Sequence, residues 1–169
     1  MHALTIFANW LGGTALTELV AGHFWVVPAL QTIHILAVAA VLVSVALINL
    51  RIVGVVDRSQ PVVVLLDRYL RPTAIALVIL AITGFLLIAG EPTRAIFRTL
   101  FWLKMGLIVA AALLTWSHRL AFAGNGGTNG GRASIGRKGV AIVALLLWIG
   151  VIVAGRWIAY VEAWPGAPA

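Results

Sequence analysis

Residues 30–50 read LQTIHILAVAAVLVSVALINL, and this stretch decides the fold because it is long and apolar enough to cross a bilayer. Its only ionisable residue is His34. At about 1.5 Å per helical residue the stretch covers roughly 30 Å, the thickness of the hydrocarbon layer. Three further stretches meet the same requirement, at residues 73–89, 97–117 and 140–161. We therefore predict an all-α integral membrane protein built as a bundle of four transmembrane helices.

The composition of the whole chain agrees with this prediction. Of the 169 residues, 62% are apolar and 10% are charged, and the mean hydropathy is +1.07. These values lie outside the range of a soluble domain of this length. The chain has no cysteine, which excludes disulfides, thiolate metal sites and thiol catalysis. We treat residues 1–169 as a single membrane domain, and its small size is compatible with a homo-oligomer.

The N-terminal segment 3–21 is less apolar than the four spans. It carries Asn9, Trp10, two consecutive glycines and Glu18, a composition that suits an amphipathic helix in the membrane interface better than a span. A fifth span in this region is the alternative. No Lys or Arg precedes Arg51, so we expect the N-terminus to remain in the mature chain and not to be removed as a signal peptide.

The distribution of the basic residues predicts the orientation of the spans. Most of them flank the two loops that follow the first and third spans: Arg51, Arg58, Arg68, Arg71, Arg119, Arg132, Arg137 and Lys138. The second of these loops contains the Gly-rich stretch 123–139, which has the composition of a flexible linker. By the positive-inside rule both loops face the cytoplasm, and both termini face the periplasm of a bacterial inner membrane. This topology explains the net charge of +7, and we expect no nucleic-acid partner.

His34, Lys104 and Arg156 are ionisable residues that lie well inside the predicted spans. Ionisable groups are costly in hydrocarbon and are kept there mainly where they bind something. Counted from the outer ends of their spans, all three lie at depths of roughly 6 to 12 Å in one leaflet. An imidazole and two cations at one level fit a b-type haem, with the histidine on the iron and the two cations beside the propionates. Snorkelling cations and a hydrogen-bonded core histidine are the alternatives.

Two further histidines are candidates for the same chemistry. His23 is the candidate for a second ligand to iron or another metal beside His34, but on one straight helix the two are about 16 Å apart. They converge only if the chain turns between them, which Gly22 and Pro28 permit. On the cytoplasmic side His118 is a candidate ligand of a second haem or contact of a quinone headgroup. A histidine in the aromatic interface belt is the alternative there.

The order of these residues resembles a known membrane architecture. The first span contains His34 in TIHILAVAAVLV, the second begins RYLRPTAIALVILAITGFLL, and the third carries Lys104 in FWLKMGLIVAA and ends at His118 in TWSHR. Over about residues 30–120 this order is similar to the bacterial membrane-embedded protoporphyrinogen oxidases and, more loosely, to the copper-resistance D-type membrane proteins. With LINLRIVG after the first span, the chain also resembles an uncharacterised proteobacterial membrane family of about this length. The resemblance implies a haem-b-binding bundle in which His34 binds iron and Lys104 acts as a base or a propionate partner.

We therefore expect a membrane haem protein that passes electrons between a periplasmic partner or oxidant and the quinone pool. Whether the chain is an enzyme stays open, because oxidation of a porphyrinogen, with Lys104 assisting proton removal, is one alternative. Binding or transport of copper or another solute is a second, although Met1 and Met105 are the only soft ligands in the chain. A structural subunit of a larger membrane complex is the third.

Overall fold

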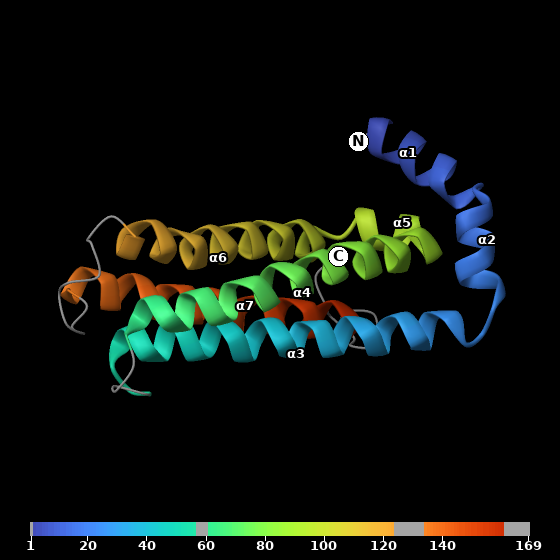
Figure 1. Ribbon diagram of the computed structural model, residues 1–169. Helices are drawn as coiled ribbons and strands as arrows, with labels where there is room; N and C mark the ends of the chain where they lie inside the picture. The colour runs from blue at the N-terminus through green and yellow to red at the C-terminus, as the bar shows by residue number, and fades with distance from the viewer. Residues whose placement is uncertain (1, 57–60, 124–133, 161–169) are drawn as a thin grey trace.

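The computed structural model describes residues 2–56, 61–123 and 134–160, and its regular elements there are all helices. In chain order these are α1 (His2–Gly12), α2 (Ala15–Gly22), α3 (Val26–Val53), α4 (Val62–Gly90), α5 (Pro92–Ile96), α6 (Thr99–Ala123) and α7 (Ile135–Tyr160). Figure 1 shows α3, α4, α6 and α7 running side by side, with α1, α2 and α5 gathered at one end. We call this the capped end. The opposite end is the basic end, since it carries Arg51, Arg68, Arg71, Arg119, Arg137 and Lys138.

The prediction of four helices able to cross a membrane is confirmed. Each is long and apolar enough, at Val26–Val53, Val62–Gly90, Thr99–Phe122 and Ile135–Trp157. The Gly-rich stretch predicted to follow the third span lies, for residues 124–133, outside the described residues. So do Arg58, Arg132 and residue 161, the predicted end of the fourth span.

The largest difference from the predicted spans is at the start of α4. The helix begins at Val62 and not at residue 73, because the turns before Pro72 are amphipathic. Their apolar side chains recur at helical spacing and are buried: Val62, Leu65, Leu66 and Leu70. Asp67 and the arginines of this segment point outward, and Asp67 lies 3.6 Å from an exposed Arg119 nitrogen on α6. A count of apolar residues misses such a helix extension, since charged residues alternate with the apolar ones.

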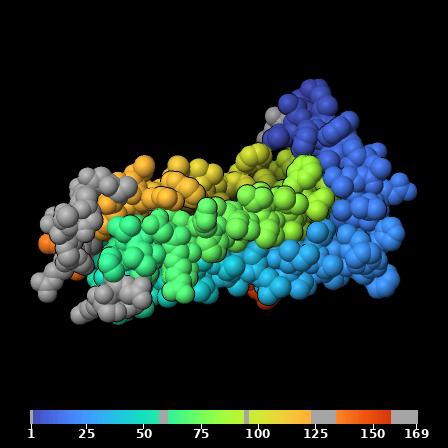
Figure 2. Space-filling model, viewed as in Figure 1, coloured from blue at the N-terminus to red at the C-terminus, as the bar shows by residue number. Residues whose placement is uncertain are grey.

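Two apolar clusters hold the spans together. Nearer the basic end, the first joins α3, α4 and α7 through Ile48, Ile52, Val62, Leu66, Leu70 and Ala141. The second, farther along the bundle, joins all four spans through Val41, Val45, Ala76, Ala111 and Trp148. α3 packs chiefly on α4 and α6 chiefly on α7, while contacts between α3 and α7 join these two pairs. Many large apolar side chains are also exposed on the outer surface, as expected where lipid surrounds the spans. Figure 2 shows one face of this surface, with α1 and α2 at one end of the spans.

The N-terminal segment forms two short helices in place of the single helix predicted over residues 3–21. The chain turns after α1 where the Gly13 amide donates to the carbonyl oxygens of Asn9 and Trp10, both at 3.2 Å. At about 16 Å and 12 Å, α1 and α2 are too short to cross the hydrocarbon layer. Within the described residues there is therefore no fifth span.

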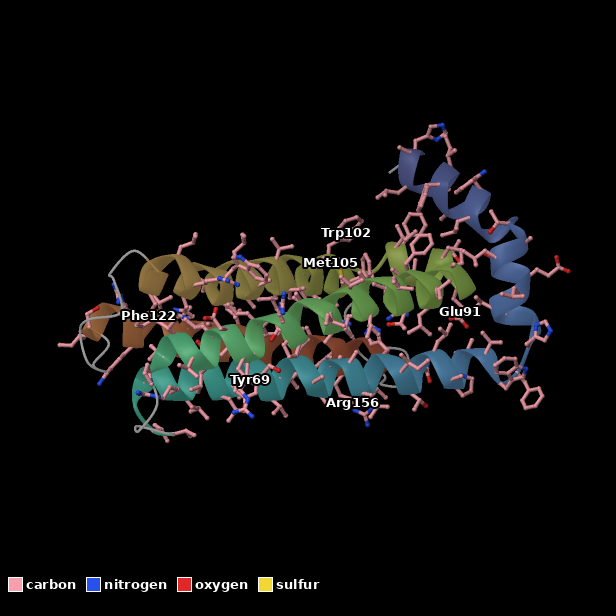
Figure 3. All side chains as sticks on the ribbon, in the orientation of Figure 1. Tyr69, Glu91, Trp102, Met105, Phe122 and Arg156 are labelled. Carbon is pink, nitrogen blue, oxygen red and sulfur yellow. The ribbon has the colours of Figure 1, made fainter. Side chains whose placement is uncertain are left out.

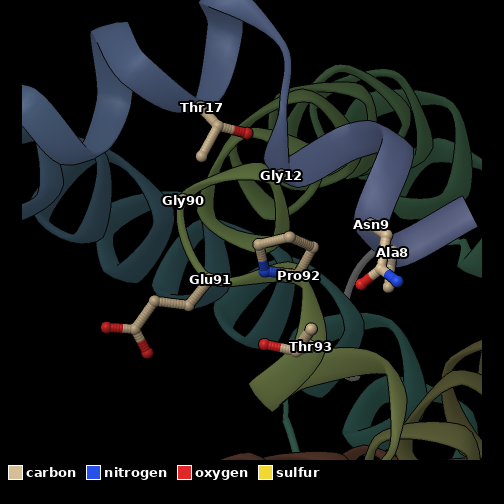
Figure 4. Close-up of a pocket in the computed structure, with 8 residues that line it drawn as sticks. All are labelled: Ala8, Asn9, Gly12, Thr17, Gly90, Glu91, Pro92 and Thr93. Carbon is tan, nitrogen blue, oxygen red and sulfur yellow. The ribbon is translucent and has the colours of Figure 1, made fainter. Parts of the chain in front are cut away.

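α2 is fastened to the end of α4 by one hydrogen bond and one close contact. The Thr17 hydroxyl lies 2.8 Å from the Ala89 carbonyl oxygen, and a Cβ at Gly90 would stand 3.0 Å from Val20 Cγ1. Between α1, α2 and the turn from α4 to α5 lies an open hollow of about 490 Å³ (Figure 4), whose lining includes Asn9 and Thr93. The capped end is thus a folded layer packed across the ends of the spans.

Candidate functional site

His34 is fixed to the neighbouring helix by a side-chain hydrogen bond. Its Nδ1 lies 2.8 Å from the Thr83 hydroxyl on α4, and that hydroxyl donates to the Ile79 carbonyl oxygen at 2.7 Å. A threonine hydroxyl has a single hydrogen, so in this arrangement its oxygen accepts from the His34 Nδ1–H. The neutral imidazole then carries its lone pair on Nε2.

The other nitrogen of His34 is open. Within the described residues Nε2 makes no hydrogen bond. Every buried side-chain nitrogen or oxygen there has a hydrogen-bond partner, so Nε2, which has none, is not fully buried. Gly84 follows Thr83 on α4, and a Cβ there would touch His34 Cε1 at 3.5 Å. A side chain at this position would therefore pack against the imidazole ring.

Lys104 lies along α7 at Gly155. A Cβ at Gly155 would stand 3.4 Å from Lys104 Nζ and 3.5 Å from its Cε, so the absence of a side chain gives the lysine its place. Lys104 lies on α6 at a depth similar to that of His34 on α3. Within the described residues Lys104 makes no hydrogen bond and no ion pair. The result is an ammonium group in the span region without a negative partner from that part of the chain.

These residues lie at one level of the bundle. Depth is measured along each helix from its end at the capped side. His34 lies about 12 Å from the start of α3, and Thr83 about 10 Å from the end of α4. Lys104 lies about 8 Å from the start of α6, and Gly155 about 8 Å from the end of α7. Each of the four spans therefore contributes to the group. We call the group of His34, Thr83, Gly84, Lys104 and Gly155 the His34 site.

Arg156 and His23 do not join this group. Arg156 follows Gly155 on α7, but its side chain is exposed, and Figure 3 shows it at the edge of the bundle beside α3. His23 is exposed in the turn between α2 and α3, with its Nδ1–H donating to the Leu19 carbonyl oxygen at 3.1 Å. His34 lies about 12 Å along α3 from its first residue, so the two imidazoles are not brought together. The prediction that both bind one metal has no geometric support here.

His118 belongs to a separate polar contact nearer the basic end. Its Nε2–H donates to Asn49 Oδ1 at 3.1 Å, and Asn49 Nδ2 donates to the Val45 carbonyl oxygen at 2.7 Å. Both side chains are fully buried. Asn49 comes about 22 Å after His34 along α3, so this pair is distinct from the His34 site. The pair joins α3 to α6 and leaves the predicted haem or quinone role of His118 as a prediction.

A second contact near it joins α6 to α7. Trp148 Nε1 donates to the Thr115 hydroxyl at 3.1 Å, and that hydroxyl donates to the Ala111 carbonyl oxygen at 2.8 Å. Polar side chains of neighbouring spans are thus hydrogen-bonded in the half of the bundle nearer the basic end. In the described residues there is no group of three or more His, Cys, Asp or Glu side chains suited to a metal ion.

Thr83, Gly84 and Gly155 were not among the residues that the sequence singled out. A depth count would have found all three, since each lies at the level of His34 and Lys104. That count was applied to ionisable residues alone. It could not have shown which sides of the helices face one another, because this depends on their rotation in the bundle.

The chain matches the family of unknown function DUF6644 over residues 7–161. No significant match was found among curated proteins or among solved structures. The resemblance to the membrane-embedded oxidases and to the copper-resistance D-type proteins therefore stays an expectation.

Proposed function

Since the chain belongs to the DUF6644 family, whose function is unknown, we propose its role from its own residues: a multi-pass membrane protein that binds a b-type haem at the His34 site and transfers electrons. One observation supports this most. An imidazole nitrogen and an ammonium group lie at a similar depth in the bundle, and within the described residues the nitrogen has no partner and the ammonium group has no negative partner. Haem offers a partner for both, since its iron accepts the imidazole lone pair and its propionates carry negative charge.

The donor set fits haem. The hydrogen bond from His34 Nδ1 to Thr83 fixes the tautomer and the ring orientation, as the outer partners of metal-binding histidines do. Lys104 supplies a positive charge for a propionate, and with Arg156 exposed at the bundle edge it is the one proposed propionate partner. A bound b-type haem would supply a one-electron redox centre between the helices. With His23 elsewhere, His34 is its one proposed protein ligand.

The direction of electron transfer follows from the proposed topology. Arginines and lysines gather at the basic end, which is proposed to face the cytoplasm of a bacterial inner membrane, with the capped end and both termini in the periplasm. The His34 site lies about 8 to 12 Å from the helix ends at the capped side. A periplasmic partner or oxidant is therefore proposed on that side, and the quinone pool of the bilayer as the other partner.

The test is the haem content of the purified protein. The chain is expressed with sufficient haem supply, and spectra are taken air-oxidised and dithionite-reduced, with pyridine haemochrome quantitation per chain. We expect near-stoichiometric haem b in the wild type, a loss of haem in His34→Ala, and wild-type content in His23→Ala, the matched control with an exposed imidazole. A colourless wild type, or full haem content in His34→Ala, would refute the proposal.

Oxidation of a porphyrinogen is the second candidate, and the position of Lys104 favours it. In its neutral amine form a lysine with no acidic partner in the described residues would accept a proton from a bound porphyrinogen, and the electrons would pass to the quinone pool. A deletion strain distinguishes the two functions. Accumulated porphyrin precursors, complemented by the wild type and not by Lys104→Met, would support the enzyme, whereas normal precursor levels would support electron transfer alone.

A further inference from the structure

The outward face of α1 is apolar. Ala8 and Leu11 are buried against the rest of the protein, with exposed fractions of 0% and 2%. Around the rest of the helix Ile6, Phe7 and Trp10 are exposed at 58%, 44% and 65%, with Phe7 next to the buried side. The rings of Phe7 and Trp10 lie 6.0 Å apart, so they form one continuous aromatic surface. The helix contains no Asp, Glu, Lys or Arg.

The position of α1 places this face at the level of the lipid headgroups. α3 is about 42 Å long, close to the roughly 40 to 45 Å of a whole bilayer with its headgroup layers. Its first turn therefore lies in the headgroup layer of the capped side, directly after the exposed rings of Phe24 and Trp25. From there α2 crosses the end of the bundle, and α1 turns back beside α5 and projects past the outline of α6 (Figure 1).

We propose that α1 is an interfacial anchor whose Ile6, Phe7 and Trp10 insert into the boundary between headgroups and acyl chains, while α2 is held by protein contacts alone. Indole rings prefer this layer of the membrane, and the lack of charge on α1 allows the whole face to enter it. The proposal uses the membrane placement and topology given above and is independent of haem.

The size of the surface favours lipid over a second copy of the chain. A helix of this length offers a face of roughly 16 Å by 10 Å, or about 160 Å². A stable protein interface buries about 800 Å² on each partner. Lipid needs no such minimum area, because each apolar side chain that enters the boundary contributes separately.

Single spin labels test the proposal, and the cysteine-free chain gives them a clean background. Trp10→Cys is compared with Glu18→Cys, exposed on α2, and with Val109→Cys, exposed on α6 within a span. The protein is reconstituted in phosphatidylethanolamine and phosphatidylglycerol vesicles, and each label's collision rates with oxygen and with a water-soluble nickel chelate are measured. We expect the ratio of the oxygen to the nickel collision rate at position 10 to lie between the values at positions 18 and 109. A label in Phe7→Cys should give a similar ratio to that at position 10.

Two results would overturn the proposal. A ratio at position 10 equal to that at 18 would place the face in water. Spin–spin broadening between labels at position 10 would show that a second copy covers the face, provided that the broadening disappears when the labelled chain is diluted with unlabelled protein. Neither result bears on haem content, so failure here is distinguishable from failure of the proposed function.

Discussion

Thr83 decides which nitrogen of His34 is open to a ligand. Thr83→Val keeps the shape of the side chain and removes the oxygen that accepts from Nδ1–H, so the ring loses its fixed tautomer and orientation. We predict a loss of haem affinity of about tenfold, while Thr83→Ser, which keeps the hydroxyl, retains wild-type affinity. Titration of apo-protein with haem measures both. Equal affinity in Thr83→Val would show that the hydrogen bond does not position the ligand.

In the proposed haem site Lys104 acts through its charge, and a neutral ligand tests this. Wild type is expected to bind haem more tightly than haem dimethyl ester, which lacks the propionate charges. In Lys104→Met this preference should disappear, because the ammonium beside Gly155 is gone, and Lys104→Arg should restore it. Competition between the two porphyrins, followed by absorption, is the measurement. An unchanged preference in Lys104→Met would mean that the propionates lie elsewhere.

At the scale of the elements, Asn49 and His118 connect α3 to α6. Replacing one partner leaves the other polar group buried without its hydrogen bond, so Asn49→Leu and His118→Phe should not be additive. A double-mutant cycle should give a coupling of about 1 kcal/mol, near the values measured for hydrogen bonds between membrane helices. Reversible unfolding in mixed detergent micelles provides the free energies. Additive effects would contradict a role of this bond in helix association.

The docking of α2 on α4 depends on Gly90. A methyl group there meets Val20 Cγ1 at 3.0 Å, so Gly90→Ala should displace α2 and raise hydrogen exchange over residues 15–22. Val20→Ala removes the opposing methyl groups, and the double variant Val20→Ala with Gly90→Ala should recover much of the wild-type protection. Exchange followed by mass spectrometry checks this. Equal protection in Gly90→Ala would show that α2 adapts to the added methyl.

At the scale of the whole molecule, the charge difference between the two ends predicts the orientation. Exposed Arg68 and Arg71 lie at the basic end, and exposed Glu18 lies at the capped end. In spheroplasts a membrane-impermeant maleimide should label Glu18→Cys at once and Arg68→Cys only after permeabilisation. The unlabelled cysteine-free parent is the control. The reverse order would invert the topology and move the His34 site to the cytoplasmic leaflet.

The sequence by itself determined the class of the protein and the number of its spans. Span length and hydropathy are local properties, so residues 30–50 predict a membrane helix whatever lies beside them. The depths of His34 and Lys104 followed in the same way from counting along each helix. The sequence predicted helix ends and breaks least well, as at the start of α4 and after Gly12. Polar residues and turns occur there, so a count of consecutive apolar residues does not locate the helix boundary.

Only the tertiary structure decided which side chains meet. The sequence suggested His23, eleven positions earlier in the chain, as a second metal ligand beside His34. In the structure the hydrogen-bond partner of His34 is Thr83 on the neighbouring helix. Lys104 lies against Gly155, whereas Arg156, one residue on, lies at the bundle edge. Successive residues of a helix point about 100° apart, so the depth of a residue does not show which neighbouring helix its side chain faces. The rotation of each helix is set by packing across the whole bundle, through contacts that no single stretch of sequence contains.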